Sequence, residues 1–348
     1  MKNIMKLLLL VVGIIIISCD KSTTESEARI KTPDEMTWTV DTFRTAPTDI
    51  QIIPEDIIAF SPKDVWIAFY SGGLTELVQH YNGKEWNGYK AGQLGGRINA
   101  LAGKSSHDIW AVGYDGNGSC ITHYDGMSWT PYSERWPDEI IDITKDDEGN
   151  YWACGRSGII LKYSGNKWKG QYFKINLNPS REEEYLLGGI AYYNKKIHLL
   201  GRKSTSGIGS TEYHIVGEFN NWTVIDSQKY SEFKTVKFGD VNFINIDNNL
   251  YSFGLEGIWE YKNSNWEQIL KLNQQIFGMS GINQNYLIAV GPFNKFYFYD
   301  GNSWVQKAYN LKTYDDNMVF DNVWTNGIET FIVGEPNIGR YALVWHGK

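Results

Sequence analysis

The sequence predicts an all-β fold: a seven-bladed β-propeller of four-stranded antiparallel blades. Tryptophans recur at about the length of one blade, and strand-like segments alternate apolar and polar residues between Gly, Asn and Asp. No long helical periodicity competes with this pattern. Of the 348 residues, 42% are hydrophobic and 15% aromatic, with 14 Trp and 35 Gly. The chain can therefore bury a large core and is not a disordered polymer.

The first residues are typical of an export signal. Lys2 and Lys6 precede an apolar run over 7–17 that is too short to span a bilayer as a helix. The run ends in Ile16-Ile17-Ser18-Cys19, which resembles the lipobox of bacterial lipoproteins. That resemblance implies a signal peptide over 1–18, cleavage before Cys19 and a lipid on its thiol. An ordinary signal peptide with a chance cysteine is the alternative.

The next segment is predicted to be a tether. Residues 19–35 hold the lipidated cysteine and a polar stretch without apolar periodicity, and the propeller follows over 36–348. We therefore expect a lipid-anchored protein of the bacterial cell envelope, with the outer membrane or cell surface favoured over the inner membrane. The other two cysteines, Cys120 and Cys154, lie in strand-like segments, where packed free thiols are expected and a disulfide is the alternative.

A repeated unit organises the rest of the chain. Its clearest copy is Asp108-Ile109-Trp110-Ala111-Val112-Gly113, followed by His-Tyr-Asp-Gly-Met-Ser-Trp over 123–129. Each copy closes on a tryptophan, and the spacing of these residues averages about 44, the length of a four-stranded blade. The closing tryptophans are Trp38, Trp86, Trp129, Trp168, Trp222, Trp266 and Trp304.

The two ends of the repeat complement each other. Trp345 occupies the position five residues before a closing tryptophan, but the sequence stops at Lys348. Trp38 begins a strand that has no blade before it. We therefore predict that the N-terminal strand around Trp38 completes the last blade, which leaves no open strand edge between the first and last blades.

The Tyr-Asp-Gly-x-x-Trp turn supplies a family resemblance. Asp-Gly or Asn-Gly provides the positive φ of a tight hairpin, and the turn resembles the Asp-box of sialidases, without the leading Ser and the residue between Asp and Gly. The Trp-Ala-Val-Gly and His-Tyr-Asp-Gly-x-x-Trp repeats also resemble exported bacterial propellers that include photosystem-assembly-factor-like proteins. The resemblance covers about residues 38–348 and implies a fold, because its motif residues are structural.

The candidate binding face comprises variable residues rather than repeated ones. Propellers bind ligands on the face made by the loops that enter the first strand and leave the second strand of each blade. Residues that follow the second strand vary in type, and Trp136 lies in a connecting loop, where it either stacks on a ligand or packs at the rim. The candidate binding residues are Tyr70, Tyr114, Trp136, Arg156, Arg202 and Glu335. A Gly/Ser/Thr-rich stretch over 201–211 is expected to be a loop on the same face, where it could bind or be a tolerated insertion.

Carboxylates are predicted near the starts of the inner strands: Glu55, Asp56, Asp142, Asp240 and Asp321. Three interpretations compete. The arginines and tyrosines hold an acidic or glycan-bearing partner; the carboxylates cleave a glycan by acid–base chemistry; or these are solvated loop residues without a ligand. Phe43-Arg44-Thr45-Ala46-Pro47 loosely resembles the arginine motif of sialidases, but it carries an insertion, and the other two arginines of their triad find no match.

The favoured function is a non-catalytic binding or assembly scaffold for an envelope protein or glycan, with a carbohydrate-active enzyme as the alternative. No catalytic signature, phosphate loop or cofactor motif is present, so we expect no catalytic residues, cofactor or metal. His80 and His123 precede a structural Tyr and are not at metal-ligand spacing. The formal net charge of −7 excludes a general nucleic-acid binder.

Overall fold

The computed structural model describes residues 29–44, 51–71, 76–91, 96–175, 183–207, 209–230, 236–307, 318–336 and 341–348. A compact unit runs from Lys31 to Lys348. Its described part contains strands and one short 3-10 helix, Pro33–Glu35, whose capping box joins Thr32 and Glu35. The predicted signal peptide, Cys19 and the tether up to residue 28 lie outside the described residues. Among the described residues, no helix is long and apolar enough to cross a membrane.

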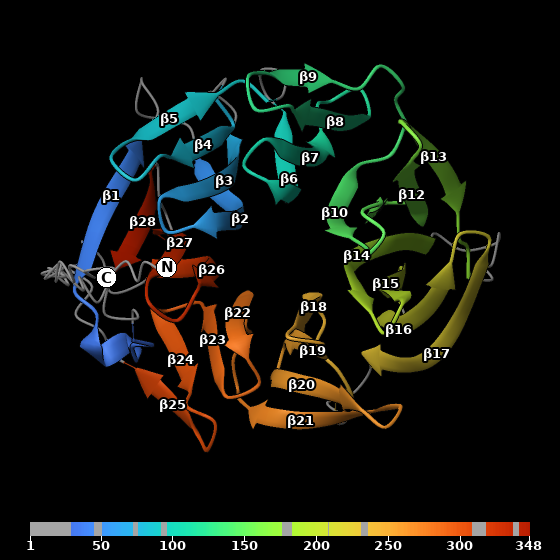
Figure 1. Cartoon of the computed structure of the whole chain (residues 1–348). Helices are drawn as coiled ribbons and strands as arrows, with labels where there is room; N and C mark the ends of the chain where they lie inside the picture. The colour runs from blue at the N-terminus through green and yellow to red at the C-terminus, as the bar shows by residue number, and fades with distance from the viewer. Residues whose placement is uncertain are drawn as a thin grey trace, which may run out of the picture. The chain divides into compact units, whose positions relative to one another are not determined.

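Five sheets have four antiparallel strands each, with the innermost strand of each sheet beside the centre of a ring (Figure 1). The first sheet contains β10 (Ile140–Lys145), β11 (Tyr151–Gly155), β12 (Ile159–Ser164) and β13 (Lys167–Tyr172). The second sheet contains β14 (Glu183–Tyr193), β15 (Lys196–Thr205), β16 (Gly209–Glu218) and β17 (Asn221–Tyr230). The third sheet contains β18 (Asn242–Ile246), β19 (Asn249–Gly254), β20 (Gly257–Lys262) and β21 (Asn265–Lys271). The fourth sheet contains β22 (Gly278–Asn283), β23 (Tyr286–Gly291), β24 (Lys295–Tyr299) and β25 (Trp304–Lys307). The last is β26 (Met318–Thr325), β27 (Thr330–Pro336), β28 (Tyr341–Gly347) and β1 (Trp38–Arg44).

The remaining eight strands form one sheet, which corrects the predicted architecture. They are β2 (Ile52–Ser61), β3 (Asp64–Ser71), β4 (Val78–Tyr81), β5 (Trp86–Tyr89), β6 (Arg97–Ser105), β7 (Asp108–Tyr114), β8 (Ser119–Tyr124) and β9 (Trp129–Pro131). β3 pairs with β6 through Tyr70 and Arg97, and the Arg97 guanidinium also lies 5.6 Å from the centre of the Tyr70 ring. The prediction of seven separate four-stranded blades is therefore wrong: five blades stand alone, and β2–β9 are continuous.

The N-terminal strand closes the last sheet, as its orphan tryptophan predicted. β1 runs antiparallel to β28 over its whole length, from Trp38 opposite Gly347 to Arg44 opposite Tyr341. The start of the compact unit is tied down as well, because Lys31 N–H donates to the Gly327 carbonyl at 2.7 Å. The two ends of the unit are thus held in the same sheet, and the edge of β28 is covered.

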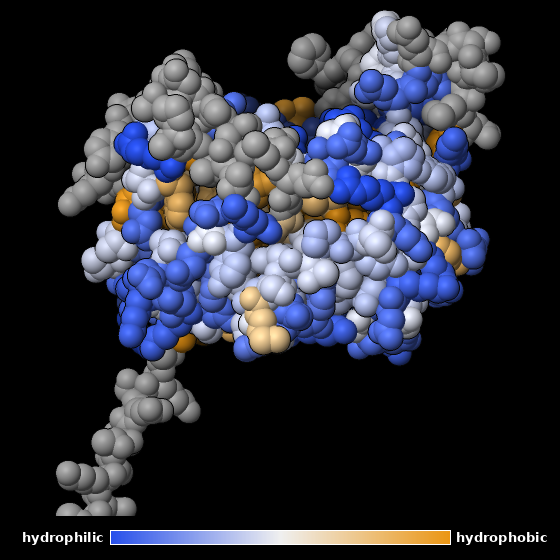
Figure 2. All heavy atoms as spheres, turned by 90° about the horizontal axis from the view of Figure 1, so that it is seen from above, coloured by the Kyte–Doolittle hydropathy of each residue, from blue (hydrophilic) through white to orange (hydrophobic). Residues whose placement is uncertain are grey.

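The core lies between neighbouring sheets, as expected for a propeller. One cluster joins Ile288 of β23 with Phe320 of β26 and Trp345 of β28, all fully buried. The repeated turn residues form hairpins: Asp125 Oδ1 accepts from the backbone N–H groups of Met127 and Ser128 at 2.9 Å, and Gly126 has φ of 96°. Hydrophilic residues cover most of the visible described surface (Figure 2).

Cys120 and Cys154 are free thiols, Cys154 fully buried and Cys120 partly so. Burial raises the pKa of both, that of Cys120 to about 11. Neither thiol is therefore activated as a nucleophile near neutral pH, and packing accounts for both residues.

Candidate functional site

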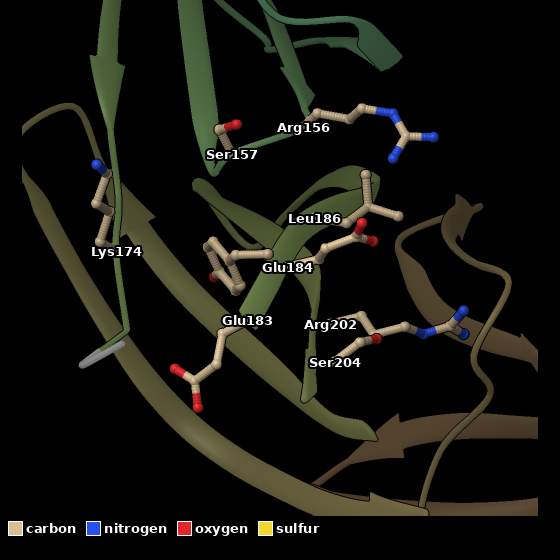
Figure 3. Close-up of a pocket in the computed structure, with 9 residues that line it drawn as sticks. Arg156, Ser157, Lys174, Glu183, Glu184, Leu186, Arg202 and Ser204 are labelled. Carbon is tan, nitrogen blue, oxygen red and sulfur yellow. The ribbon is translucent and has the colours of Figure 1, made fainter. Parts of the chain in front are cut away.

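Five of the predicted face residues lie at or just after the second strand of a repeat, and Trp136 lies in the connection between β9 and β10. Arg156 and Arg202 lie on neighbouring sheets, directly after β11 and within β15, and only these two of the predicted residues line a common hollow. The hollow measures about 490 Å³. Figure 3 shows both guanidinium groups on the same side of β14, with Glu184 and Leu186 between them. The other lining residues are Ser157, Lys174, Glu183, Tyr185 and Ser204.

Arg156 is anchored at its base and open at its tip. Its backbone N–H donates to the Glu139 carbonyl at 3.0 Å, and its Nε donates to Glu139 Oε2 at 2.8 Å. Asn99 donates to the other oxygen of Glu139 at 3.0 Å. The Arg156 side chain nevertheless remains 56% exposed. The anchor therefore orients the guanidinium and leaves most of it available to a ligand.

Arg202 also stabilises the fold, through an ion pair with a buried carboxylate. Its Nε and Nη2 donate to Glu212 Oε1 at 2.9 and 2.8 Å, and Nη2 lies 3.4 Å from Asp240 Oδ2. Glu212 is fully buried, and Gln228 donates to its second oxygen at 2.9 Å. Replacing Arg202 alone would leave a buried carboxylate without its counter-charge, which is strongly destabilising. Arg202 is therefore unsuitable as a probe of binding.

The aromatic face residues and Glu335 lie outside the hollow. Tyr70 packs under Arg97, while Tyr114 is 36% exposed and donates from its hydroxyl to the Gly116 carbonyl. Trp136 packs on Gly170 of β13: a Cβ at Gly170 would come within 2.5 Å of Trp136 Nε1. Of the two roles considered for Trp136, packing at the rim is the one that this geometry supports.

The stretch over 201–211 is not a loop, which corrects that expectation. β15 continues to Thr205, and β16 begins at Gly209, with Thr205 and Gly209 paired. Ser204 and Ser210 share a cross-strand hydrogen bond at 3.0 Å, and the Arg202–Glu212 pair joins the same two strands. Cross-strand pairs of this kind stabilise a hairpin despite a Gly/Ser/Thr-rich composition.

Two of the predicted carboxylates, Asp56 and Asp142, line the central channel, and we call this pair the belt. Asp56 accepts from the N–H groups of Ile57 and Leu101, both at 2.8 Å. Asp142 likewise accepts from Ile143 at 2.8 Å and Ile190 at 3.0 Å. Each carboxylate thus binds its own inner strand and the first strand of the following repeat. They line a channel cavity of about 290 Å³.

Sequence reasoning missed the partners of these carboxylates. Asn322 Nδ2 donates to Asp56 Oδ1, and Asn242 Nδ2 donates to Asp142 Oδ2, both at 3.0 Å. Counting back along the chain instead selected Asp321 and Asp240, one and two residues earlier. Asn242 and Asn322 hold the same place in their strands as Asp56 and Asp142. Like those aspartates, each accepts a hydrogen bond on its Oδ1 from the backbone N–H of the next residue.

The belt does not resemble a catalytic pair. Burial raises the pKa of Asp56 to about 6 and that of Asp142 to about 7. A raised pKa alone would suit a general acid. However, both oxygens of each carboxyl group already accept hydrogen bonds from the protein. The geometry therefore assigns the two residues to holding the inner strands together.

The histidines are engaged in structural contacts. His80 Nε2 lies 2.8 Å from Asp64 and stacks on Trp66; His123 does the same with Asp108 and Trp110. Within the described part of the chain, no group of three His, Cys, Asp or Glu residues is arranged to hold a metal ion.

The described part of the sialidase-like motif, Phe43 and Arg44, lies in β1. Arg44 belongs to β1, the outermost strand of its sheet, and its guanidinium lies 4.7 Å from the centre of the Tyr341 ring. Residues 45–47 of the motif lie outside the described residues. The described arginine thus packs at the rim.

These features define a β-propeller with a polar, charged hollow on one face. Solved structures with this fold include YCF48, a photosystem assembly factor, bound to the D1 peptide, with a TM-score of 0.60, 16% identity and coverage of 91% of this chain and 96% of that one. YCF48 from Cyanidioschyzon merolae matches with a TM-score of 0.59 and 14% identity over 89% of this chain and 98% of that one. The resemblance to assembly-factor-like propellers is thus supported at the level of the fold.

Other similar proteins have different activities. Catalytically inactive virginiamycin B lyase from Staphylococcus aureus, with quinupristin, matches with a TM-score of 0.61 and 12% identity over 89% of this chain and 99% of that one. Immune protein Tsi7 of Pseudomonas aeruginosa is 24% identical over 110 residues, 30% of this chain and 35% of that protein. This chain thus spans about a third of the curated relative's length. No family model matches the chain.

Proposed function

We propose that this chain is a non-catalytic binding propeller that holds an acidic segment of a protein partner in the face hollow. The observation that carries the proposal is the hollow itself, which Arg156, Lys174 and the start of β14 line together (Figure 3). Arg202 and Glu183 have partners there, Glu212 and Lys203 respectively. Arg156 and Lys174 therefore provide the cationic contacts for a carboxylate-bearing ligand.

A protein partner is favoured over a glycan. Glycan sites typically expose an aromatic face for stacking, but Trp136 packs on Gly170, and Tyr185, the aromatic residue lining the hollow, is 6% exposed. The alternative of a glycan-cleaving enzyme draws no support from Asp56 and Asp142, since both are occupied by structural hydrogen bonds. The D1 peptide bound to YCF48 gives a precedent for a peptide ligand on this fold.

Binding at the hollow is tested with acidic peptides selected by display against the full chain. We expect Arg156→Ala/Lys174→Ala to weaken the selected peptides by about tenfold or more, because two charge-assisted contacts are lost. Isothermal titration calorimetry measures the affinities. The matched control is Lys195→Ala/Lys196→Ala, which makes the same charge change at the turn between β14 and β15, the opposite end of β14. Equal affinity for both variants would overturn the assignment of the hollow.

The location rests on the sequence. We propose that Cys19 carries the lipid that holds the propeller at the bacterial envelope, at the outer membrane or cell surface rather than the inner membrane. Several buried acyl chains hold a protein on a membrane, at about 0.8 kcal/mol per buried CH2. Cys19→Ala is expected to abolish palmitate labelling and to move the protein from the membrane fraction to the soluble fraction. Retained labelling and membrane association in Cys19→Ala would contradict the anchor; Cys120→Ala serves as the control.

A further inference from the structure

A second group of charged residues lies beyond the belt, apart from the hollow. Glu55 and Asp321 occupy equivalent places, since each is the extra residue of a β-bulge on its inner strand, β2 or β26. They directly precede Asp56 and Asn322, whose side chains join these two strands at 3.0 Å. Glu335 lies on β27, paired with Val319 of β26. Three carboxylates from neighbouring strands therefore lie close enough to influence one another, and we call this group, next to the belt, the channel mouth.

The three carboxylates of the mouth have few positively charged or hydrogen-bonding partners among the described residues. Arg97 Nη2 contacts Glu55 at 2.8 Å, whereas Glu335 receives one long contact, 3.5 Å, from Gln51 Nε2. Asp321 Oδ2 is buried and has no hydrogen-bond partner among the described residues. A buried carboxylate oxygen without a partner carries a large desolvation penalty.

The electrostatics of the mouth agree with this geometry. Burial, together with the charge of Glu55, raises the pKa of Glu335 to about 7. Burial and then the charges of Glu335 and Glu55 raise the pKa of Asp321 well above its usual value. Glu139 adds a further negative charge near Glu55. The mouth thus holds protons near neutral pH that an incoming cation would displace.

The mouth fits an organic cation better than a metal ion. No group of three acidic or histidine ligands in the described part of the chain is arranged around a common point for a metal. A guanidinium, by contrast, spreads its donors over a plane and can bridge carboxylates that are separated from one another. Its stem also tolerates partial burial.

We propose that the channel mouth beside Asp321 and Glu335 receives an arginine side chain of a protein partner. None of these three carboxylates lines the hollow that contains Arg156. This proposal can therefore be tested independently of the proposed acidic ligand. If one partner engages both sites, its binding segment carries an arginine as well as carboxylates.

The test uses the blocked peptide Gly-Ser-Arg-Ser-Gly and its glutamine counterpart, Gly-Ser-Gln-Ser-Gly, with the full chain. Calorimetry near pH 7 in two buffers with different ionisation enthalpies measures both affinity and protons released. We expect the arginine peptide alone to bind, with release of protons, because the guanidinium favours the charged carboxylates. Asp321→Asn should weaken binding by at least about tenfold.

The controls separate this site from the hollow and from misfolding. Glu184→Gln removes the same charge at the hollow and should leave binding of the arginine peptide unchanged, as should Lys174→Ala. Asp321→Asn should not lower the unfolding midpoint, since Asp321 Oδ2 has no hydrogen bond to lose among the described residues. Equal binding of the two peptides, or unchanged binding and proton release in Asp321→Asn, would overturn the proposal. Saturation of the mouth by Ca²⁺ or Mg²⁺ in competition with the peptide would also overturn it.

Discussion

Replacing Asp142 by alanine is expected to lower the free energy of unfolding by about 3–5 kcal/mol, because three buried donors lose their acceptor. The donors are Ile143 N–H, Ile190 N–H and Asn242 Nδ2, at 2.8, 3.0 and 3.0 Å. These bonds join inner strands that are far apart in the sequence, so the loss affects closure of the ring. Urea denaturation of the purified chain measures the effect.

Two comparisons make the Asp142 prediction specific. Asp142→Asn keeps the shape of the side chain, but whichever way the amide is turned, its NH2 group faces at least one of the three donors. It should therefore also destabilise the protein, though less than alanine. Glu218→Ala removes an exposed carboxylate on β16 and should change stability by less than about 0.5 kcal/mol. A loss in Asp142→Ala no greater than that in Glu218→Ala would show that the belt is not needed for the fold.

A large pH effect is expected from a buried histidine pair, whose contribution to the stability of the fold should be lost as the solution becomes acidic. His198 Nδ1 lies 2.8 Å from His214 Nε2, and Trp266 Nε1 donates to His214 Nδ1 at 3.2 Å. Since the indole N–H only donates, His214 Nδ1 must accept, and its Nε2–H donates to His198. Both rings are therefore neutral.

The direction of the pH effect follows from burial. Burial lowers the pKa of His198 from 6.5 to about 4. Burial, followed by the charge of His198, lowers the pKa of His214 well below its usual value. The unfolded chain takes up protons below pH 6.5 that the folded pair cannot accept. Stability is thus fully present above about pH 6.5 and is lost as the pH falls toward 4, by about 2–3 kcal/mol for His198 at pH 4.5. Asp56 and Asp142 act in the opposite direction, because their raised pKa values make the folded state lose stability as the pH rises through 6 to 7.

Comparing variants isolates the histidine contribution from that of the carboxylates. Wild type should be more stable than His198→Leu at pH 7.5, and the difference should shrink by about 2–3 kcal/mol at pH 4.5, since the variant lacks one titrating ring. His107→Leu, which makes the same substitution at an exposed histidine, is the control for the change to leucine. A constant difference between wild type and His198→Leu across this range would contradict the neutral buried pair.

Much of the fold was predictable because its signals are local and repeated. Each turn that keeps the Asp-Gly or Asn-Gly pair carries its own positive-φ glycine and its own acceptor, as at Asp125 and Gly126, so it forms in the same way in each of these repeats. The orphan strand at Trp38 was predictable for a related reason: an incomplete unit at one end and an extra strand at the other complete one sheet.

The candidate site was only partly predictable. Counting along the strands placed Arg156 and Arg202 on one face, and they do line one hollow, but the sequence did not show that Arg202 would neutralise Glu212. The count also selected Asp321 rather than Asn322 for the belt, because a β-bulge shifts the register by one residue and turns a different side chain toward the neighbouring strand.

The sequence by itself determined the all-β class, the repeated turns and the closing role of β1, since each depends on residues within one repeat or at its ends. Only the tertiary structure decided that β2–β9 form one continuous sheet, which charges are neutralised and where the hollow lies. These features depend on pairs such as Tyr70 with Arg97 and Asp142 with Asn242. Such pairs join different repeats, and their contacts exist only once the ring has closed.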